Sequence, residues 1–298
     1  MSETSEKTAL AAMLRQHVDR LAGLIGPRHL GKPSTMAATQ TLIENELTQA
    51  GYIVTKETYL ALAQPVFNLI VELPGTRRPD EILVVGAHYD TVSTTPGADD
   101  NASAVAVLIE VAKRLQGKRF QRTVRLIALA CEEPPHYHLG EMGSQIHARG
   151  CRERNEKVVG MLALEMLGYF RDEPGSQQIP KTIPKLIRWF IPTKANFVAA
   201  VGNLSSCRLL WKFRRGFKRS TKLPLLSLAL PEKIEEIRRS DNSSFWDQGY
   251  PALMITDTSF LRNPHYHQPT DTPDTLDYER MAEVVPGVCG AIVAIAGG

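Results

Sequence analysis

The apolar run Ile82-Leu-Val-Val-Gly-Ala87 leads directly into His88-Tyr-Asp90. Such a run predicts a strand that is buried on both faces, as in the centre of a parallel or mixed sheet. In open α/β sheets, ligands bind outside the carboxyl ends of the strands. We therefore expect this strand to be central, and we expect His88 and Asp90 to lie at the edge of the sheet that binds ligands.

Further segments with the composition of strands alternate with segments whose apolar residues recur at the helical spacing of about 3.6. The predicted strands are Ile53–Leu60, Phe67–Leu73, Ile82–Ala87, Val124–Cys131, Met161–Leu167, Phe197–Val201 and Ala252–Thr256. The predicted helices are Glu6–Leu24, Thr35–Ala50, Ala102–Leu115 and Tyr278–Ala296, the last with a kink or break at Pro286. This alternation predicts an α/β fold, a three-layer α/β/α sandwich around a mixed, mostly parallel central sheet.

The composition is that of an ordinary globular chain. Of its 298 residues, 43% are hydrophobic and 22% are charged, which excludes a disordered chain, a collagen-like repeat and a simple coiled coil. We expect one domain over residues 1–298. Within it, residues 170–231 are less regular and rich in Pro, Gly and basic residues, and we expect them to form a cap over the site or a surface excursion.

The net charge of +3 conceals a basic segment, Arg208–Lys222, which holds seven Lys or Arg and no acidic residue. The rest of the chain is therefore net negative. A nucleic-acid-binding domain would be basic across a whole face, so we expect no nucleic-acid partner. We expect instead a solvated helix whose long Lys and Arg side chains lie along its surface, with contact to a membrane surface as the alternative.

Three features favour a cytoplasmic location. The four cysteines are widely scattered and form no CxxC pair, as is usual where thiols stay reduced. The longest apolar run, Val288–Ala296, is far shorter than the ~20 residues of a membrane span. The first residues lack the basic start and apolar stretch of a secretory signal. We therefore expect no transmembrane segment.

Side chains that bind metals follow several of the predicted strands. Glu132 and Glu133 come directly after Val124–Cys131, Glu165 stands near the end of Met161–Leu167, and His267 lies downstream of Ala252–Thr256. Because the ends of parallel strands meet at one edge of the sheet, these residues should converge with His88. A set of nitrogen and oxygen donors without thiolate suits zinc, cobalt or manganese.

Asp90 stands two residues after His88. We expect it to accept the other ring N–H of that histidine, as carboxylates do beside many metal-binding histidines.

Five motifs occur in a fixed order along the chain. They are His88-Tyr-Asp90, Pro96-Gly-Ala-Asp-Asp-Asn-Ala-Ser103, Glu132-Glu133, Leu164-Glu165-Met166 and His267-Gln-Pro-Thr-Asp-Thr272. In this order and spacing they resemble the di-zinc aminopeptidase family of metallopeptidases, whose zinc-exopeptidase-like fold is also that of glutaminyl cyclases. The resemblance runs from about Thr35 to the C-terminus.

The resemblance implies two Zn²⁺ ions per chain and a zinc-dependent exopeptidase, an aminopeptidase that acts on peptides or aminoacyl amides. The implied roles are His88 and Glu165 on one zinc, Glu133 and His267 on the other, Asp100 as the bridge between them, and Glu132 as the general base. It also implies a cis peptide bond between Asp100 and Asn101.

The chain departs from the commonest family pattern at several positions. Glu165 stands where the best-known members have Asp, and Asn242 stands where many have His. An insertion, Pro134–His138, follows the two glutamates and should change the local wall of the pocket. These departures remove no metal ligand, but they leave the substrate contacts open.

For other residues near the motifs we expect structural or pocket-lining roles. Cys131 reads as a small buried hydrophobe and Asp99 as a loop residue, whereas Asp271 could either anchor a loop or support a ligand. Each of His136, His138 and His265 could line the pocket, because each lies close to a motif in sequence.

Three other functions remain open at this point. The first is a glutaminyl cyclase, with one zinc and an intramolecular attack. The second is a hydrolase of a non-peptide amide. A non-catalytic binding module is the least favoured, because the ligand set and the base are all present.

Overall fold

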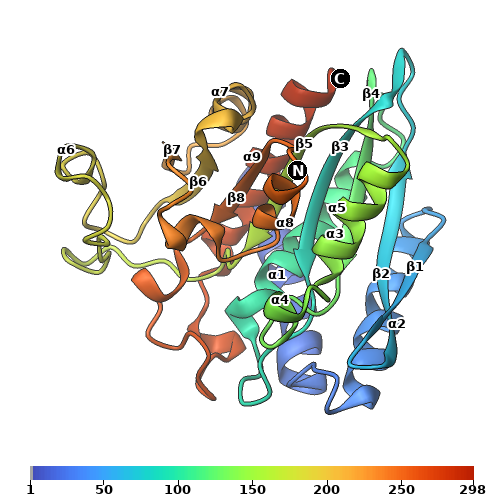
Figure 1. Cartoon of the computed structure of the whole chain (residues 1–298). Helices are drawn as coiled ribbons and strands as arrows, with labels where there is room; N and C mark the ends of the chain where they lie inside the picture. The colour runs from blue at the N-terminus through green and yellow to red at the C-terminus, as the bar shows by residue number, and fades with distance from the viewer. Residues whose placement is uncertain (1–2) are drawn as a thin grey trace.

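The computed structural model describes residues 3–298, and in this range eight strands form one sheet in the order β1-β2-β4-β3-β5-β8-β6-β7. Figure 1 shows the sheet running through the molecule from β1 on the right to β7 on the left. The strands are β1 (Thr55–Ala61), β2 (Gln64–Leu73), β3 (Arg78–His88), β4 (Arg122–Leu129), β5 (Lys157–Glu165), β6 (Val198–Asn203), β7 (Leu225–Leu230) and β8 (Ala252–Thr256).

The four central strands β4, β3, β5 and β8 are parallel to one another. β1 and β2 add an antiparallel hairpin on one side, and on the other side β6 is antiparallel to β8 and parallel to β7. Residues 82–88 of β3 are all buried, as a strand covered on both faces requires. The predicted mixed, mostly parallel sheet is confirmed.

Helices cover both faces of the sheet, so the predicted three-layer architecture is confirmed as well. Buried residues of α1 (Glu3–Val18), α2 (Pro33–Gln49), α3 (Ala104–Leu115), α7 (Cys207–Ser220) and α9 (Tyr278–Ala296) share one apolar core with the sheet. Those of α5 (Gly143–Glu153) and α8 (Asn242–Asp247) share a second core with its other face. Two single-turn helices, α4 (His136–Leu139) and α6 (Lys185–Arg188), lie in connections.

Two helices differ from the prediction. The first predicted helix does not continue regularly to Leu24, because α1 ends at Val18 and a π-helical turn, Asp19–Ile25, follows. The sequence left open a kink or a break at Pro286, and the structure shows no break, because α9 runs through that residue to Ala296. Val284, Val285 and Val288 around the proline are fully buried, so tertiary packing outweighs the lost backbone hydrogen bond.

Part of the segment 170–231 is more regular than expected. β6, α7 and β7 form a strand–helix–strand unit at the edge of the main sheet, and the irregular part is confined to about residues 171–197. The basic residues of α7 conceal an apolar face, on which Leu209, Phe213 and Phe217 are buried. Among the described residues, none of the helices has the length and apolar character needed to cross a membrane.

Helices α7 and α9 pack along each other through glycines. A Cβ on Gly216 would lie 2.6 Å from Ala291 Cα and closer still to the Gly290 carbonyl oxygen, and a Cβ on Gly290 would collide with Ser220. Because backbone faces backbone here, the contact has no flexible side chain that could move away. Glycine at position 216 is therefore required by packing.

We predict that Gly216→Ala destabilises the protein by about 1–3 kcal/mol, the usual cost of overpacking. Helix propensity alone predicts the opposite sign, a gain of about 1 kcal/mol. The measurement is the free energy of unfolding in urea. Gly23→Ala is the control, because a Cβ there makes only an ordinary contact of 3.9 Å with Pro273. An unchanged or increased stability of Gly216→Ala would contradict the close packing of α7 on α9.

Candidate metal centre and active site

The predicted site residues meet at the carboxyl edge of the parallel strands. His88 is the last residue of β3 and Glu165 the last of β5. Glu133 follows the end of β4, and Asp100 lies in the irregular turn Ala98–Ser103 between β3 and α3. His267 comes from the loop after β8. The convergence expected from the strand ends is therefore present.

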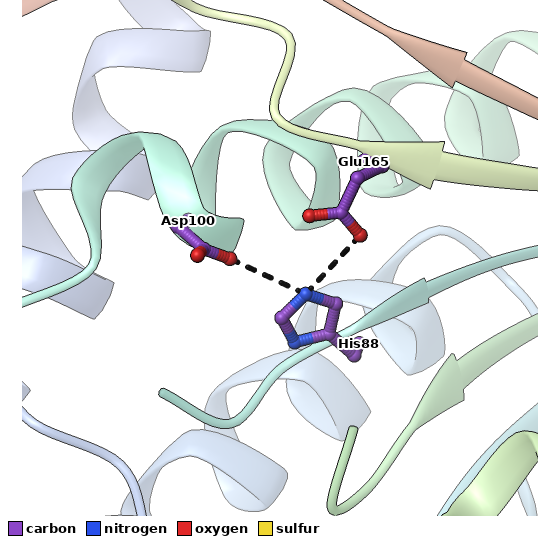
Figure 2. A group of neighbouring side chains, drawn as sticks. All are labelled: His88, Asp100 and Glu165. Atoms are coloured by element: carbon purple, nitrogen blue, oxygen red, sulfur yellow. Dashed lines mark ion pairs between the residues drawn. The ribbon is translucent and has the colours of Figure 1, made fainter. Parts of the chain in front are cut away.

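Three of these side chains form a first group, shown in Figure 2. His88 Nε2 lies 3.4 Å from Asp100 Oδ1 and 3.4 Å from Glu165 Oε2. All three residues are buried, and their ligand atoms lie within 4.8 Å of one another. The two carboxylates are thus directed at the same ring nitrogen.

A second group shares Asp100 with the first. His267 Nε2 lies 3.1 Å from Asp100 Oδ2 and 3.3 Å from Glu133 Oε2. The two oxygens of Asp100 thus face different histidines, one in each group. This is the composition that the family resemblance implied, with Asp100 between the two pairs.

Several polar atoms of the two groups lack hydrogen-bond partners in the described chain. Buried atoms without a partner include His88 Nε2, Asp100 Oδ1, Glu133 Oε1 and His267 Nε2. Buried polar atoms are nearly always satisfied, so this concentration at one place requires an explanation. Metal cations at the two groups would satisfy these atoms, and a donor set of imidazole and carboxylate fits zinc.

The charges in the centre also favour a bound cation. Burial, and then repulsion from Asp100, raises the pKa of Glu133 to about 7. Burial by itself lowers the pKa of His267, yet the nearby carboxylates of Asp100 and Glu133 raise that pKa to about 10. The carboxylates therefore repel one another and attract positive charge, which a divalent cation supplies.

Asp90 supports both His88 and the turn after β4. Its Oδ1 lies 3.4 Å from His88 Nδ1, on the side of the ring away from Asp100. The same carboxylate accepts the backbone N–H groups of Glu132 at 3.0 Å and Glu133 at 3.1 Å. The carboxylate therefore lies beside His88 Nδ1, and it also fixes the backbone of both glutamates.

Hydrogen bonds with the side chains of Asp271 and Asn101 fix the turn that carries Asp100. The Asp271 carboxylate accepts the backbone N–H groups of Asp99 at 2.9 Å and Asp100 at 3.1 Å. The Asn101 side chain donates to Leu164 O and accepts from Met166 N, the residues on either side of Glu165. Asp271 thus anchors the turn, and Asn101 sets the position of Asp100 relative to Glu165.

A buried arginine holds the backbone that leads into the same turn. Arg28 is fully buried and donates to the backbone carbonyls of Tyr89, Pro96 and Gly97. Burial lowers its pKa to about 10, although nearby carboxylates oppose the shift. The peptide bond between Asp100 and Asn101 is cis, as the resemblance implied.

Glu132 is the carboxylate that lies beside the two groups without belonging to either. It is partly exposed and lines a cavity of about 540 Å³ together with Asp100, Glu133, Glu165 and His267. Burial, and then the charges of Glu165 and Glu133, raises its pKa well above the usual value, although His88 opposes the shift. The raised pKa means that this carboxylate takes up a proton more readily than an exposed glutamate does.

Sequence reasoning missed several residues of the site. Ser240 donates to Glu165 Oε2 at 2.7 Å. Asp241 is buried, with both carboxylate oxygens unpartnered, and burial raises its pKa to about 7. The ring of Tyr266 stacks on His267 at 3.8 Å and lines the cavity. Only Tyr266 had a signal in the sequence, as the neighbour of a predicted ligand.

The other nearby residues behave mostly as ordinary structural groups. Of the three histidines close to the motifs, His138 lines the cavity, whereas His136 pairs with Glu141 and His265 contacts Thr270. Cys131 is buried, as expected. Asn242, which replaces the common histidine, donates to Ile237 O within its own turn.

A second, apolar pocket adjoins the cavity that Glu132 lines. It has a volume of about 90 Å³, and its lining shares Glu165, Arg239 and Tyr266 with the larger cavity. Its apolar lining comes mainly from β6, β7, β8 and the segment 177–197, and it includes Ile183, Ile191, Phe197, Val201, Leu228 and Met254. The site therefore combines a charged floor with an apolar side pocket.

Comparison with known families decides what the chain is related to. The model of peptidase family M28 matches residues 68–206 and 210–291. The chain belongs to peptidase family M28. The match includes every residue of the two groups, so the candidate centre lies within the part that defines the family.

Curated relatives of this M28 chain include a protein of unknown activity. The uncharacterized protein YfbL of Escherichia coli is 35% identical over 293 residues, which cover 96% of this chain and 88% of YfbL. A probable leucine aminopeptidase 1 of Trichophyton verrucosum is 27% identical over 242 residues, which cover 77% of this chain and 58% of the fungal protein. The M28 chain thus matches little more than half of the fungal protein's length.

Solved structures share the fold at low sequence identity. The zinc aminopeptidase BSAP of Bacillus subtilis superimposes with a TM-score of 0.76 at 15% identity, covering 95% of this chain and 94% of BSAP. A glutaminyl cyclase of Fimbriiglobus ruber superimposes with a TM-score of 0.67 at 19% identity, covering 95% of each chain. The fold alone therefore does not separate an aminopeptidase from a cyclase.

We predict that Asp271→Asn lowers the affinity of the M28 centre for zinc by about 10–100-fold, the usual cost of losing a group that orients a ligand. An amide can accept only one of the two backbone N–H groups well, so the turn with Asp100 loosens. A competition titration with a zinc-binding dye measures the affinity. Asp274→Asn is the control, because Asp274 is exposed and pairs with Arg15. Equal zinc affinities for the two variants would show that Asp271 does not position Asp100.

Proposed function

We propose that this M28 peptidase is a zinc-dependent aminopeptidase that hydrolyses the N-terminal residue from peptides. One observation carries the proposal: two groups of ligand type share Asp100 and lie beside Glu132 at one cavity. Family membership supports metallopeptidase chemistry, and a probable leucine aminopeptidase among the relatives supports the exopeptidase assignment.

In this proposal His88, Asp100 and Glu165 hold one Zn²⁺, and Asp100, Glu133 and His267 hold the other. When bound, the metal supplies Lewis acidity, which polarises a carbonyl and lowers the pKa of water towards ~7. Asp90 keeps His88 oriented through Nδ1, so that Nε2 remains available to the metal. The Ser240 hydroxyl group donates a hydrogen bond to Glu165 and so orients its carboxylate.

Glu132 is the proposed general base. It lies at the cavity, outside both groups, so its carboxylate is available to accept a proton from the attacking water. It then donates that proton to the nitrogen of the leaving amine. Its backbone N–H is bound by Asp90, which keeps the start of the side chain in place.

Substrate charge favours an exopeptidase. Glu132 lines the cavity outside both metal groups, and its carboxylate complements the positive charge of a free amino terminus. The apolar pocket beside Glu165 would take the side chain of the first residue. A blocked amine loses this charge and adds bulk at the carboxylates.

A glutaminyl cyclase is the second candidate, because solved cyclases share the fold. The second group, with Glu133 and His267, argues for two metals rather than one. A hydrolase of a non-peptide amide would use the same residues and is separated only by its substrate. A non-catalytic binding module is the least favoured, since no residue of the two groups is missing.

The proposed activity predicts a preference for free amino termini. Leucyl or alanyl amides should be cleaved, and their N-acetyl forms should be cleaved at least ~10²-fold more slowly, a loss of about 2.7 kcal/mol in transition-state stabilisation. The measurement is kcat/KM on each pair of substrates. A cyclase would ignore leucyl amides and convert glutaminyl peptides to pyroglutamyl peptides with release of ammonia. Similar rates on blocked and free substrates would indicate an amidase or endopeptidase instead.

A second prediction concerns the base. Glu132→Gln should retain two zinc ions per chain while its turnover falls by about 10²–10⁴-fold, because only proton transfer is lost. Metal analysis and kcat on an aminoacyl amide are measured on the same sample, before and after dialysis against a chelator.

Glu235→Gln is the matched control, since Glu235 lines the same cavity and is exposed. Its turnover should stay within a few-fold. If Glu132→Gln lost zinc and recovered full turnover once zinc was restored, Glu132 and Glu133 would have to exchange roles.

A further inference from the structure

The excess of positive charge in this chain is concentrated at one edge of the sheet. Between Pro174 and Pro231 there are eleven Lys or Arg and no Asp or Glu, so the rest of the chain is net negative. In the described part of the chain, none of these eleven cations forms an ion pair with an acidic side chain. The stretch includes α6, β6, α7 and β7, and β7 is the outermost strand on this side (Figure 1).

The segment around α6 has apolar residues on two opposite sides. On the inner side Ile183 and Ile191 are buried and line the apolar pocket. On the outer side Leu186, Trp189 and Phe190 are 83%, 88% and 81% exposed. Figure 1 shows α6 projecting from the body of the molecule. Isolated exposed apolar residues are common, but three large ones within five positions mark a contact surface.

Cations occur along the segment that carries α6 and along α7. Lys181, Lys185, Arg188 and Lys194 lie in the same segment. On α7, the cations Arg208, Arg214, Arg215, Lys218 and Arg219 share the exposed face with Trp211, which is 57% exposed. Arg215 lies over the Trp211 ring at 5.5 Å. Exposed aromatic rings among unpaired cations therefore occur in both elements.

We infer that this edge of the protein docks on an anionic phospholipid surface. The Leu186, Trp189 and Phe190 side chains insert at the level of the headgroups, where Trp and Phe side chains of surface-bound segments lie. The unpaired Lys and Arg side chains bind the lipid phosphates and add attraction across a Debye length of about 8–10 Å. This inference does not depend on the proposed peptidase activity.

Charge and shape favour this occupant over two others. In a symmetric contact with a second copy, the same patch would face itself, and the unpaired cations would repel one another. Single-stranded nucleic acids bind to basic grooves in which bases stack on rings. Here the aromatic side chains project outward together with an aliphatic one, Leu186, which offers no base a stacking surface.

Sedimentation with vesicles tests the inference. The full chain should bind vesicles of equimolar phosphatidylglycerol and phosphatidylcholine, should not bind pure phosphatidylcholine, and should be released by high salt. The double variant Trp189→Ser/Phe190→Ser should lower the vesicle affinity at least ~10-fold. Lys185→Glu/Arg188→Glu should lower it similarly and weaken the salt dependence. Arg214→Glu/Arg215→Glu should weaken binding and leave turnover on a small aminoacyl amide within a few-fold.

Matched controls use exposed residues far from this edge in the sequence. Ile53→Ser removes an apolar side chain that is 90% exposed, and Lys118→Glu/Arg119→Glu reverses two exposed charges. Both should bind vesicles as the unaltered chain does, and all variants should keep its thermal unfolding midpoint. The inference is overturned if the controls lose binding as much as the α6 variants. It is also overturned if no anionic vesicle binds, if single-stranded DNA binds more tightly at the same salt, or if the α6 variants only abolish self-association.

Discussion

The carboxylate of Asp100 is the element on which the rest of the centre depends. One of its oxygens faces His88 and the other faces His267, so a displacement of either oxygen would disturb both groups at once. Hydrogen bonds with three buried polar side chains fix the turn that carries this residue. These side chains are Arg28, Asn101 and Asp271. Burying that many like charges is costly unless a cation compensates them, so the geometry and the implied metals explain each other.

The sequence predicted the sheet well because its signal is local. The central strands are long apolar runs, and burial on both faces of a parallel strand leaves that mark in the sequence. The same reasoning located His88, Glu133 and Glu165, since each of them stands at or just after the end of such a run. It reached His267 less directly, because that residue lies farther downstream of its strand. Only the resemblance to a family singled out Asp100. The structure brings all five together, whereas their roles as ligands rest on the proposal.

Other features lacked a local signal. Arg28 and Asp241 act through contacts with residues distant in sequence, and nothing in the neighbouring residues distinguishes them from surface charges. The apolar face of α7 was hidden by the cations on its other side, although Leu209, Phe213 and Phe217 are spaced to lie together. Proline disfavours the interior of a helix, yet α9 continues through Pro286, because packing on both sides of the helix outweighs this preference.

The two pockets that meet at Glu165 are built from different parts of the chain. They share Glu165, Arg239 and Tyr266, but most of their other lining differs. The carboxylates of the charged cavity stand near strand ends in the middle of the sheet, whereas the apolar pocket is lined mainly by β6, β7, β8 and the loop before β6. Loops of this kind tolerate insertion and exchange far better than central strands do. An exchange of the segment 177–197 would therefore reshape the apolar pocket while leaving the two candidate metal-binding groups in place.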